Sequence, residues 1–228
     1  MMDLLNPATT DQIFDALYAP SNSLEQMSNQ ALSNGIDLYM KEQYEDAAKE
    51  FKRSIGLSAN SDFSVSATNY LAQTYLKLGD SDEAVKAYEM GIQNNSYDAD
   101  LRMSLGNLHF SEGRYVEAQE SYEAAVRLDD SAGSRFALGQ VFLKTNRLRE
   151  AELQFQKVRR LTPESTNGDY GLGLTYAKME QPEKAIKHFE AALKLKKDFY
   201  DAHFEIGTLY ADMGDMEKAT EINDFLED

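Results

Sequence analysis

The 228-residue sequence has no cysteine, no tryptophan, only four prolines and only three histidines. Without cysteine it can form neither a disulfide framework nor a thiolate metal site. It also has no run of 18 apolar residues and no basic start followed by an apolar stretch. The sequence therefore predicts neither a membrane span nor a signal peptide. These absences favour a cytoplasmic protein, unless a signal peptide has been removed, which the doubled methionine at the start leaves open.

A small residue recurs at a nearly constant interval along the chain. From the second position onward the interval is 33 or 34 residues, and the first interval is 37. The six positions are Gly35, Ala72, Gly106, Gly139, Gly173 and Gly207. Twelve residues after each comes an alanine: Ala47, Ala84, Ala118, Ala151, Ala185 and Ala219. Sixteen residues after five of them comes an aromatic: Phe51, Tyr88, Tyr122, Phe155 and Phe189, whereas the sixth has Asn223. Such a fixed period predicts an array of repeats.

The two glycines Gly171 and Gly173 raise the alternative of a phosphate-binding loop. A dinucleotide-binding motif needs a third glycine three residues later, where this sequence has Tyr176, and a preceding strand, of which there is no sign. Glycine inside a helix costs about 0.5–1 kcal/mol relative to alanine. Its recurrence therefore indicates a close contact between two helices, with the aromatic residues filling the space around it.

Each period divides into two helices separated by a turn. In the fifth period an apolar helical pattern ends at Glu180-Gln181-Pro182, and a second pattern follows with apolar residues at helical spacing. Proline is well placed in the first turn of a helix. The other breaks contain turn and capping residues, such as Gly79-Asp80-Ser81, Glu112-Gly113 and Gly214-Asp215. Because no segment alternates with a period of two, we expect an all-α chain.

These offsets resemble the tetratricopeptide repeat, a helix-turn-helix unit of 34 residues. The resemblance implies a right-handed α-solenoid of antiparallel helix pairs. It covers residues 28–228 as six repeats, near 28–64, 65–98, 99–131, 132–165, 166–199 and 200–228. The early tryptophan of the family is absent, and its closing proline is present only as Pro163. The longer first interval predicts an extended loop around residues 59–61.

Residues 1–27 precede the repeats and have their own apolar stripe. We expect a short amphipathic helix that ends at Ala19-Pro20. Because solenoid ends need covering, this helix is predicted to cap the array. Docking on a neighbouring molecule is the alternative.

The net charge of −16 is unevenly distributed. Residues 144–197 contain 12 Lys/Arg and 7 Asp/Glu, so this stretch is basic within an acidic chain. Either these are ordinary solvated helix faces, or they present a basic surface to an acidic partner. Nucleic acid is not an expected partner, because an acidic chain repels phosphate at long range.

The histidines suggest no chemistry. His109 and His203 occupy positions that other repeats fill with apolar or aromatic residues, so we expect them to serve packing. His188 is expected near the surface of a second helix. No nucleophile, metal-ligand set or cofactor motif accompanies them, and we predict no enzyme activity, no metal and no cofactor.

The resemblance also implies where a ligand would bind. In the family the first helices line a concave groove, and ligand contacts fall mostly at repeat positions 2, 5, 9, 12 and 13. Carried onto this sequence, the predicted groove residues are Asn69, Gln73, Lys77, Met103, Asn107, Phe110, Phe136, Gln140, Lys144, Tyr170, Leu174, Lys178 and Phe204. They offer side-chain amides for the backbone of a peptide, aromatic anchors and a cationic rim. Alternatively, the aromatic residues only pack against neighbouring helices.

Family members that bind chaperone tails clamp a carboxylate with basic residues at positions 5, 2 and 6. The first repeats of this sequence lack those cations and have Leu32, Asp100 and Ser104 instead. We therefore predict a non-enzymatic adaptor that binds another peptide or helix. The alternatives are a self-assembling structural module that forms homo-oligomers, and the repeat arm of a larger protein or enzyme.

Overall fold

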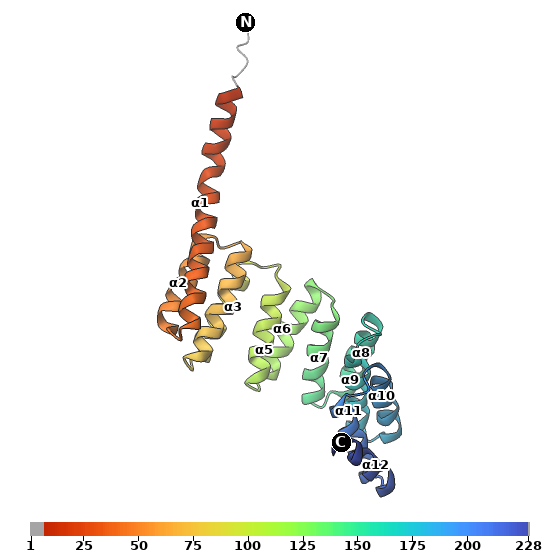
Figure 1. Cartoon of the computed structure of the whole chain (residues 1–228). Helices are drawn as coiled ribbons and strands as arrows, with labels where there is room; N and C mark the ends of the chain where they lie inside the picture. Colours follow the sequence, from red (N-terminus) through yellow and green to blue (C-terminus); the bar gives the residue numbers. More distant parts are fainter. Residues whose placement is uncertain (1–6, 228) are drawn as a thin grey trace. The chain divides into compact units, whose positions relative to one another are not determined.

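A computed structural model describes the backbone of residues 7–227 and the side chains of residues 23–222. The described residues form helices and no strand, as predicted (Figure 1). The helices are α1 (Pro7–Met40), α2 (Tyr44–Leu57), α3 (Asp62–Lys77), α4 (Ser81–Asn94), α5 (Ala99–Ser111), α6 (Tyr115–Leu128), α7 (Ala132–Lys144), α8 (Leu148–Leu161), α9 (Thr166–Lys178), α10 (Pro182–Leu195), α11 (Tyr200–Asp212) and α12 (Met216–Glu227). Across this part of the chain, no helix is both long and apolar enough to cross a membrane.

The chain divides into two compact units, residues 1–105 and 106–228. In the N-terminal unit α2 packs against α1 and α3, and α3 packs against α4. In the C-terminal unit each helix from α6 to α12 packs against the next. First helices also contact one another, α1 with α3 and α7 with α9. Odd-numbered helices are the first helices of the pairs, and even-numbered helices are the second.

Each turn inside a helix pair places one residue in the left-handed region of the backbone. Glycine occupies this place in three turns, with φ of 79° at Gly79, 75° at Gly113 and 82° at Gly214. The other three turns have Glu42, Asn146 and Glu180 there, with φ of 60°, 60° and 57°. The turn is therefore the same whether or not glycine is available, so helix packing rather than local preference determines it. Pro182 begins α10, as predicted.

The N-terminal helix does not end at Ala19-Pro20, and that prediction was wrong. α1 is one helix of 34 residues that continues through Pro20 into the first repeat (Figure 1). An internal proline removes one hydrogen bond and costs roughly 3 kcal/mol. The helix is anchored beyond this point, because the buried Ser28 Oγ donates to the backbone oxygen of Ser54 in α2 at 2.9 Å. A helix fixed there extends back across the proline.

The extended loop predicted around residues 59–61 is also absent. Only four residues separate α2 from α3, the same number as between α4 and α5. The three additional residues instead lengthen α3, which has 16 residues where α5, α7, α9 and α11 have 13. Ser61 caps this longer helix by accepting a hydrogen bond from the Ser64 backbone N–H at 3.2 Å.

The repeated glycines make room for the aromatic ring sixteen residues later. A Cβ built on each would lie impossibly close to a ring atom: 2.5 Å for Gly35 and Phe51, 2.5 Å for Gly106 and Tyr122, 2.8 Å for Gly139 and Phe155, and 2.5 Å for Gly173 and Phe189. The alanines twelve residues after the small positions are all buried, with at most 3% of their surface exposed. At these four glycines the small residue and its ring therefore pack in the core of the helix pair, which confirms the close contact predicted from the sequence.

Gly171 has its own contact, on a different neighbour from Gly173. A Cβ at Gly171 would lie 2.4 Å from the Phe155 ring of α8, whereas Gly173 lies against Phe189 of α10. The two glycines thus let α9 approach the second helix on either side. They serve helix packing, and the phosphate-loop alternative does not hold.

Candidate functional site

The predicted groove residues lie on first helices in both units. In the N-terminal unit Asn69, Gln73 and Lys77 are on α3, and Met103 is on α5. Gln73 and Lys77 are exposed, whereas Met103 is half-buried. The Asn69 Nδ2 donates to the Val65 backbone oxygen of its own helix at 3.2 Å. This amide is therefore partly used within α3.

In the C-terminal unit the amides are Asn107 on α5 and Gln140 on α7, and both side chains are exposed. The Asn107 Oδ1 accepts a hydrogen bond from the Tyr122 hydroxyl at 2.7 Å. Asn107 can therefore offer a ligand its two N–H donors, whereas its oxygen is already used by Tyr122. Burial raises the pKa of Tyr122 to about 12, so this hydroxyl keeps its proton at neutral pH. Gln140 is the amide better placed to pair with a peptide backbone.

The aromatic residues of the predicted groove differ in how far packing uses them. Phe136 lies edge-on to the core ring of Phe155, with centroids 5.6 Å apart, and is half-buried. Tyr170 lies between Phe189 at 5.6 Å and Phe199 at 4.8 Å. Each of these two residues therefore supports its own helix pair.

Phe204 and Phe110 complete the set. Phe204 on α11 is 62% exposed, which is unusual for a phenylalanine. Phe110 is half-buried and lies edge-on to Tyr115 at 5.5 Å. Phe204 is thus the residue with the most free apolar surface among the predicted aromatic anchors.

The remaining predicted residues lie along the same helices. Lys144 and Lys178 are exposed in the last turns of α7 and α9. Cations at this end of a helix also interact favourably with the helix dipole, so their presence has a structural reason too. Leu174 packs against the buried cluster around Phe189 and Ile206. We define the first-helix face as the exposed surface of α7, α9 and α11 that carries Gln140, Tyr170, Lys178 and Phe204.

Two carboxylates on α11 were missed in the sequence, although they occupy known contact positions. Asp201 and Glu205 lie one turn apart at repeat positions 2 and 6 of the sixth repeat. Burial, Glu205 and Asp201 together raise the pKa of Tyr170 to about 12. Burial and the neighbouring Asp201 raise the pKa of Glu205 above its ordinary value. The sequence shows both carboxylates at these positions, but not that they act on Tyr170 of the preceding repeat.

The raised pKa of Glu205 predicts a pH-dependent gain from removing its charge. When the pKa of a carboxyl is higher in the folded state than in the unfolded state, the folded protein loses stability as the pH rises from the unfolded-state pKa through the folded-state pKa. Glu205→Gln should therefore raise the melting temperature by about 1–2 °C at pH 7, since the group is only half-buried. The gain should vanish below about pH 4, where both states are protonated. Thermal unfolding at both pH values, with exposed Glu120→Gln as the control, tests this; an equal shift at both pH values would contradict it.

A second group of titratable residues lies between α8, α9 and α10. His188 Nδ1 is 2.8 Å from Asp169 Oδ1, and Asp169 is also 3.4 Å from an Arg159 nitrogen. The His188 ring stacks on Tyr176 at 5.3 Å, and the Tyr176 hydroxyl donates to Glu152 at 2.6 Å. The His188 side chain is 18% exposed, so it lies partly at the surface of α10 while contacting α9. These contacts join three helices, which is a packing role.

Two other kinds of site, a metal site and a basic surface, have little support within residues 23–222. In that range no group of three or more His, Asp or Glu residues could hold a metal ion. Among the basic residues between 144 and 197, Arg147 contacts Glu150, Gln119 and the Phe142 ring, and Arg159 pairs with Asp169. These contacts favour the ordinary helix-face interpretation for those two arginines.

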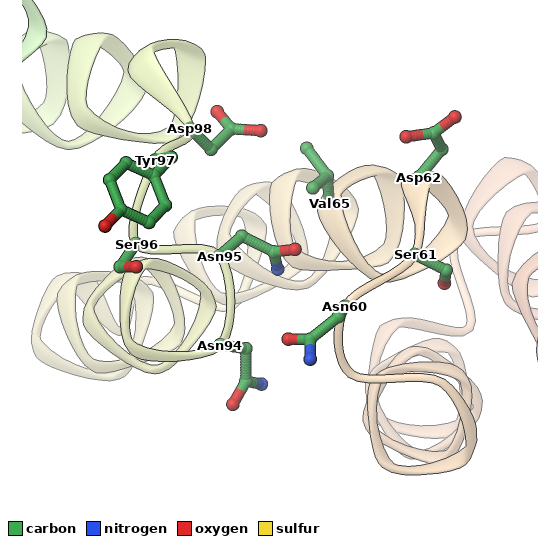
Figure 2. Close-up of a pocket in the computed structure, with 9 residues that line it drawn as sticks. All are labelled: Asn60, Ser61, Asp62, Val65, Asn94, Asn95, Ser96, Tyr97 and Asp98. Carbon is green, nitrogen blue, oxygen red and sulfur yellow. The ribbon is translucent and has the colours of Figure 1, made fainter. Parts of the chain in front are cut away.

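Figure 2 shows a polar hollow in the N-terminal unit that the sequence did not predict. It has a volume of about 450 Å³ and lies between the loops before α3 and α5. Asn95 Nδ2 donates to the Ala59 backbone oxygen at 3.1 Å and so ties the two loops together. Asp98 caps α5 by accepting a hydrogen bond from the Leu101 N–H at 2.8 Å. Its polar residues thus have structural tasks, whereas Tyr97 at its rim is 87% exposed.

The helix pairs and their glycine–aromatic contacts agree with the match of this chain to one known family. Tetratricopeptide repeat models match residues 32–99, 69–132, 103–166, 170–199 and 200–222. The chain belongs to the tetratricopeptide repeat family. These models describe repeats rather than a catalytic domain, and the fold suggests a protein–protein interaction scaffold.

Solved structures similar to this chain include other tetratricopeptide repeat proteins. MamA is 26% identical, with a TM-score of 0.60, covering 67% of this chain and 90% of its own. The type IV pilus biogenesis factor PilW is 15% identical, with a TM-score of 0.71, covering 89% of this chain and 93% of its own. YrrB is 22% identical, with a TM-score of 0.60, covering 75% of this chain and 88% of its own.

Two curated human proteins match shorter segments. Protein O-mannosyl-transferase TMTC1 is 34% identical over 83 residues, which are 36% of this chain. Tetratricopeptide repeat protein 21A is 30% identical over 86 residues, which are 35% of this chain. The matched segments span only 9% and 6% of these two relatives. The similarity to these two proteins is therefore limited to a few repeats.

Proposed function

We propose that this protein is a non-enzymatic adaptor that holds a peptide or helix of a partner protein on the first-helix face. The observation that carries the proposal is Phe204, whose ring is 62% exposed on α11. It occupies the same repeat position as Tyr170 on α9 and Phe136 on α7. An exposed aromatic in line with half-buried ones offers the kind of anchor that dominates binding energy at protein interfaces.

Polar groups beside these rings suit a peptide backbone. Gln140 has an exposed amide that can both donate and accept. Asn107 contributes N–H donors, since its oxygen already binds Tyr122. One of the similar solved structures, YrrB, is described as having an unusual peptide-binding site, which supports a peptide ligand for a relative of this fold.

Two alternatives each have an observation in their favour. Leu24 and Met27 on α1 are 44% and 45% exposed, which favours self-assembly through this long helix. The similarity to a segment of an O-mannosyl-transferase favours a repeat arm within a larger enzyme. Neither alternative accounts for the exposed Phe204 at a ligand-contact position.

Affinity capture from the native cell extract, read by mass spectrometry, tests the proposal. The variant Gln140→Ala/Lys178→Ala/Phe204→Ala removes only exposed side chains of the first-helix face. The control Glu120→Ala/Leu153→Ala/Lys187→Ala removes three exposed side chains from the second helices α6, α8 and α10. We expect a partner that the control retains and the face variant loses, with all three baits melting within about 2 °C of one another. If the face variant retained every partner of the wild type, the proposal would be wrong.

A further inference from the structure

The part of the first-helix face around α9 and α11 combines exposed aromatic surface with negative charge. Tyr200 and Phe204 on α11 are 61% and 62% exposed, and Tyr170 on α9 contacts Phe199 at the start of α11. Asp201 and Glu205 project from the same helix, close enough to Tyr170 to raise its pKa. An occupant of this surface must therefore satisfy both aromatic rings and carboxylates.

Glu205 occupies a register position where the other repeats have no charge. The equivalent residues are Ser33, Tyr70, Ser104, Ala137 and Gly171. In α9 this position lies directly against a core ring, since a Cβ at Gly171 would be 2.4 Å from Phe155. A carboxylate placed there is partly removed from water, which agrees with the raised pKa of Glu205. The fold does not need this charge.

The fold also does not neutralise the charge. Within residues 23–222, no Lys, Arg or His nitrogen lies within 4.0 Å of the carboxylate of Asp201 or Glu205. Lys196, which precedes α11, lies over the Phe199 ring at 5.7 Å and forms no ion pair with either carboxylate. Two like charges four residues apart on a helix destabilise it. The charge of Glu205, half-buried and beside Asp201, is therefore disfavoured in the free protein, and a bound cation would relieve it.

The aromatic rings define which cation fits. A guanidinium or ammonium group is attracted to the face of an aromatic ring, and arginine can also bind a carboxylate through two parallel hydrogen bonds. Both carboxylates act on the Tyr170 hydroxyl, and Phe204 is exposed on the same helix as the carboxylates, next to Glu205 in the sequence. At repeat positions 2 and 6, α7 has Gly133 and Ala137, and α9 has Asn167 and Gly171. Among the three helices of the first-helix face, α11 alone therefore carries negative charge at these two positions.

We infer that the partner segment carries an arginine or lysine that binds between Asp201 and Glu205, with its side chain against Tyr170 and Phe204. This inference rests on the proposed function, because it concerns the same face. It assigns the opposite charge preference from a carboxylate clamp. It also orients the segment on the face. The basic side chain binds at the N-terminal half of α11, whereas the cations Lys144 and Lys178 lie at the opposite, C-terminal ends of α7 and α9.

A phage library of random 12-residue peptides tests the inference with the full chain as bait. Selections run in parallel on the wild type, on Asp201→Asn/Glu205→Gln, and on the face variant Gln140→Ala/Lys178→Ala/Phe204→Ala. The matched control is Glu217→Gln/Glu221→Gln, which removes an exposed pair of carboxylates with the same spacing on α12. The wild type and the control should enrich peptides with Arg or Lys at one fixed place beside an apolar residue. A synthetic peptide of that sequence should bind Asp201→Asn/Glu205→Gln about tenfold more weakly, the loss expected for one charged hydrogen bond.

The outcomes separate this inference from the proposed function. Peptides that need the face residues but show no basic preference would overturn the inference and leave the adaptor function standing. The same result would follow if the selected peptide bound Asp201→Asn/Glu205→Gln as tightly as the wild type. If no peptide distinguished the wild type from the face variant, the proposed function would fall and this inference with it.

Discussion

Phe155→Ala should lower the free energy of unfolding by about 3–5 kcal/mol, the range for removing a fully buried aromatic side chain. The Phe155 ring is 1% exposed and lies between Gly139 of α7 and Gly171 of α9. It also contacts the Phe136 ring, with centroids 5.6 Å apart. Because both glycines lack the atoms that could move into the vacated space, the cavity cannot close without a shift of three helices.

Urea unfolding of the whole chain, followed by circular dichroism, measures this loss. The control is Leu153→Ala, two residues earlier on the same helix, where the side chain is 47% exposed. It should cost less than about 1 kcal/mol, because little apolar surface returns to water. Equal midpoints for the two variants would show that Phe155 is not the central contact of these repeats.

Gly173→Leu is the second substitution with a large expected effect. A Cβ at this position would lie 2.5 Å from a Phe189 ring atom, and the Phe189 ring is itself fully buried. The ring cannot rotate away without losing its packing, so α9 and α10 must separate. Overpacking of this kind costs about 1–3 kcal/mol or more. Chemical denaturation of the wild type and the variant at one pH gives the difference.

Gly133→Leu is the matched control for that experiment. Gly133 lies in the first turn of α7, where an added Cβ meets only the Ser131 hydroxyl at 3.9 Å. Leucine also has a higher helix propensity than glycine, so this variant should be neutral or slightly more stable. If Gly173→Leu unfolded at the same denaturant concentration as Gly133→Leu, the glycine would not serve the ring.

The helix pairs could be predicted from the sequence because each glycine and its ring are a fixed sixteen residues apart within one repeat. Because this pair of residues recurs in successive repeats, the contact between glycine and ring could be inferred from the sequence. Gly171 has no such period: its partner Phe155 belongs to the preceding repeat, and other repeats place Tyr, Ser, Ala or Glu at the same position. Contacts between repeats that vary in residue type leave no regular pattern to find.

The boundary errors have a different cause. Local preference predicts a helix end at Pro20, but the contact of Ser28 with α2 holds a longer helix together. The longer first interval predicts three additional residues in a loop before Ala72. They instead form most of an extra turn at the start of α3, where Ser61 supplies the cap. Tertiary contacts and capping decided both places.

For the candidate site, the sequence predicted which helices carry it but not which side chains are available. Phe136, Tyr170 and Asn107 are each partly used by packing or by a hydrogen bond, whereas Gln140 and Phe204 are exposed. Availability depends on the neighbouring helix, which a repeat position alone does not specify. Asp201 and Glu205 become noticeable only once the lack of a described counter-charge and the proximity of Tyr170 are seen.

Site-specific photo-crosslinking in the native cell tests the central claim most directly. A photoreactive phenylalanine analogue at Gln140 or Phe204 reports contacts of the first-helix face, and the same analogue at Leu153 reports those of a second helix. The adaptor proposal predicts that one partner protein is crosslinked from positions 140 and 204 and not from 153. A partner crosslinked from position 153 alone, with positions 140 and 204 giving none, would contradict it.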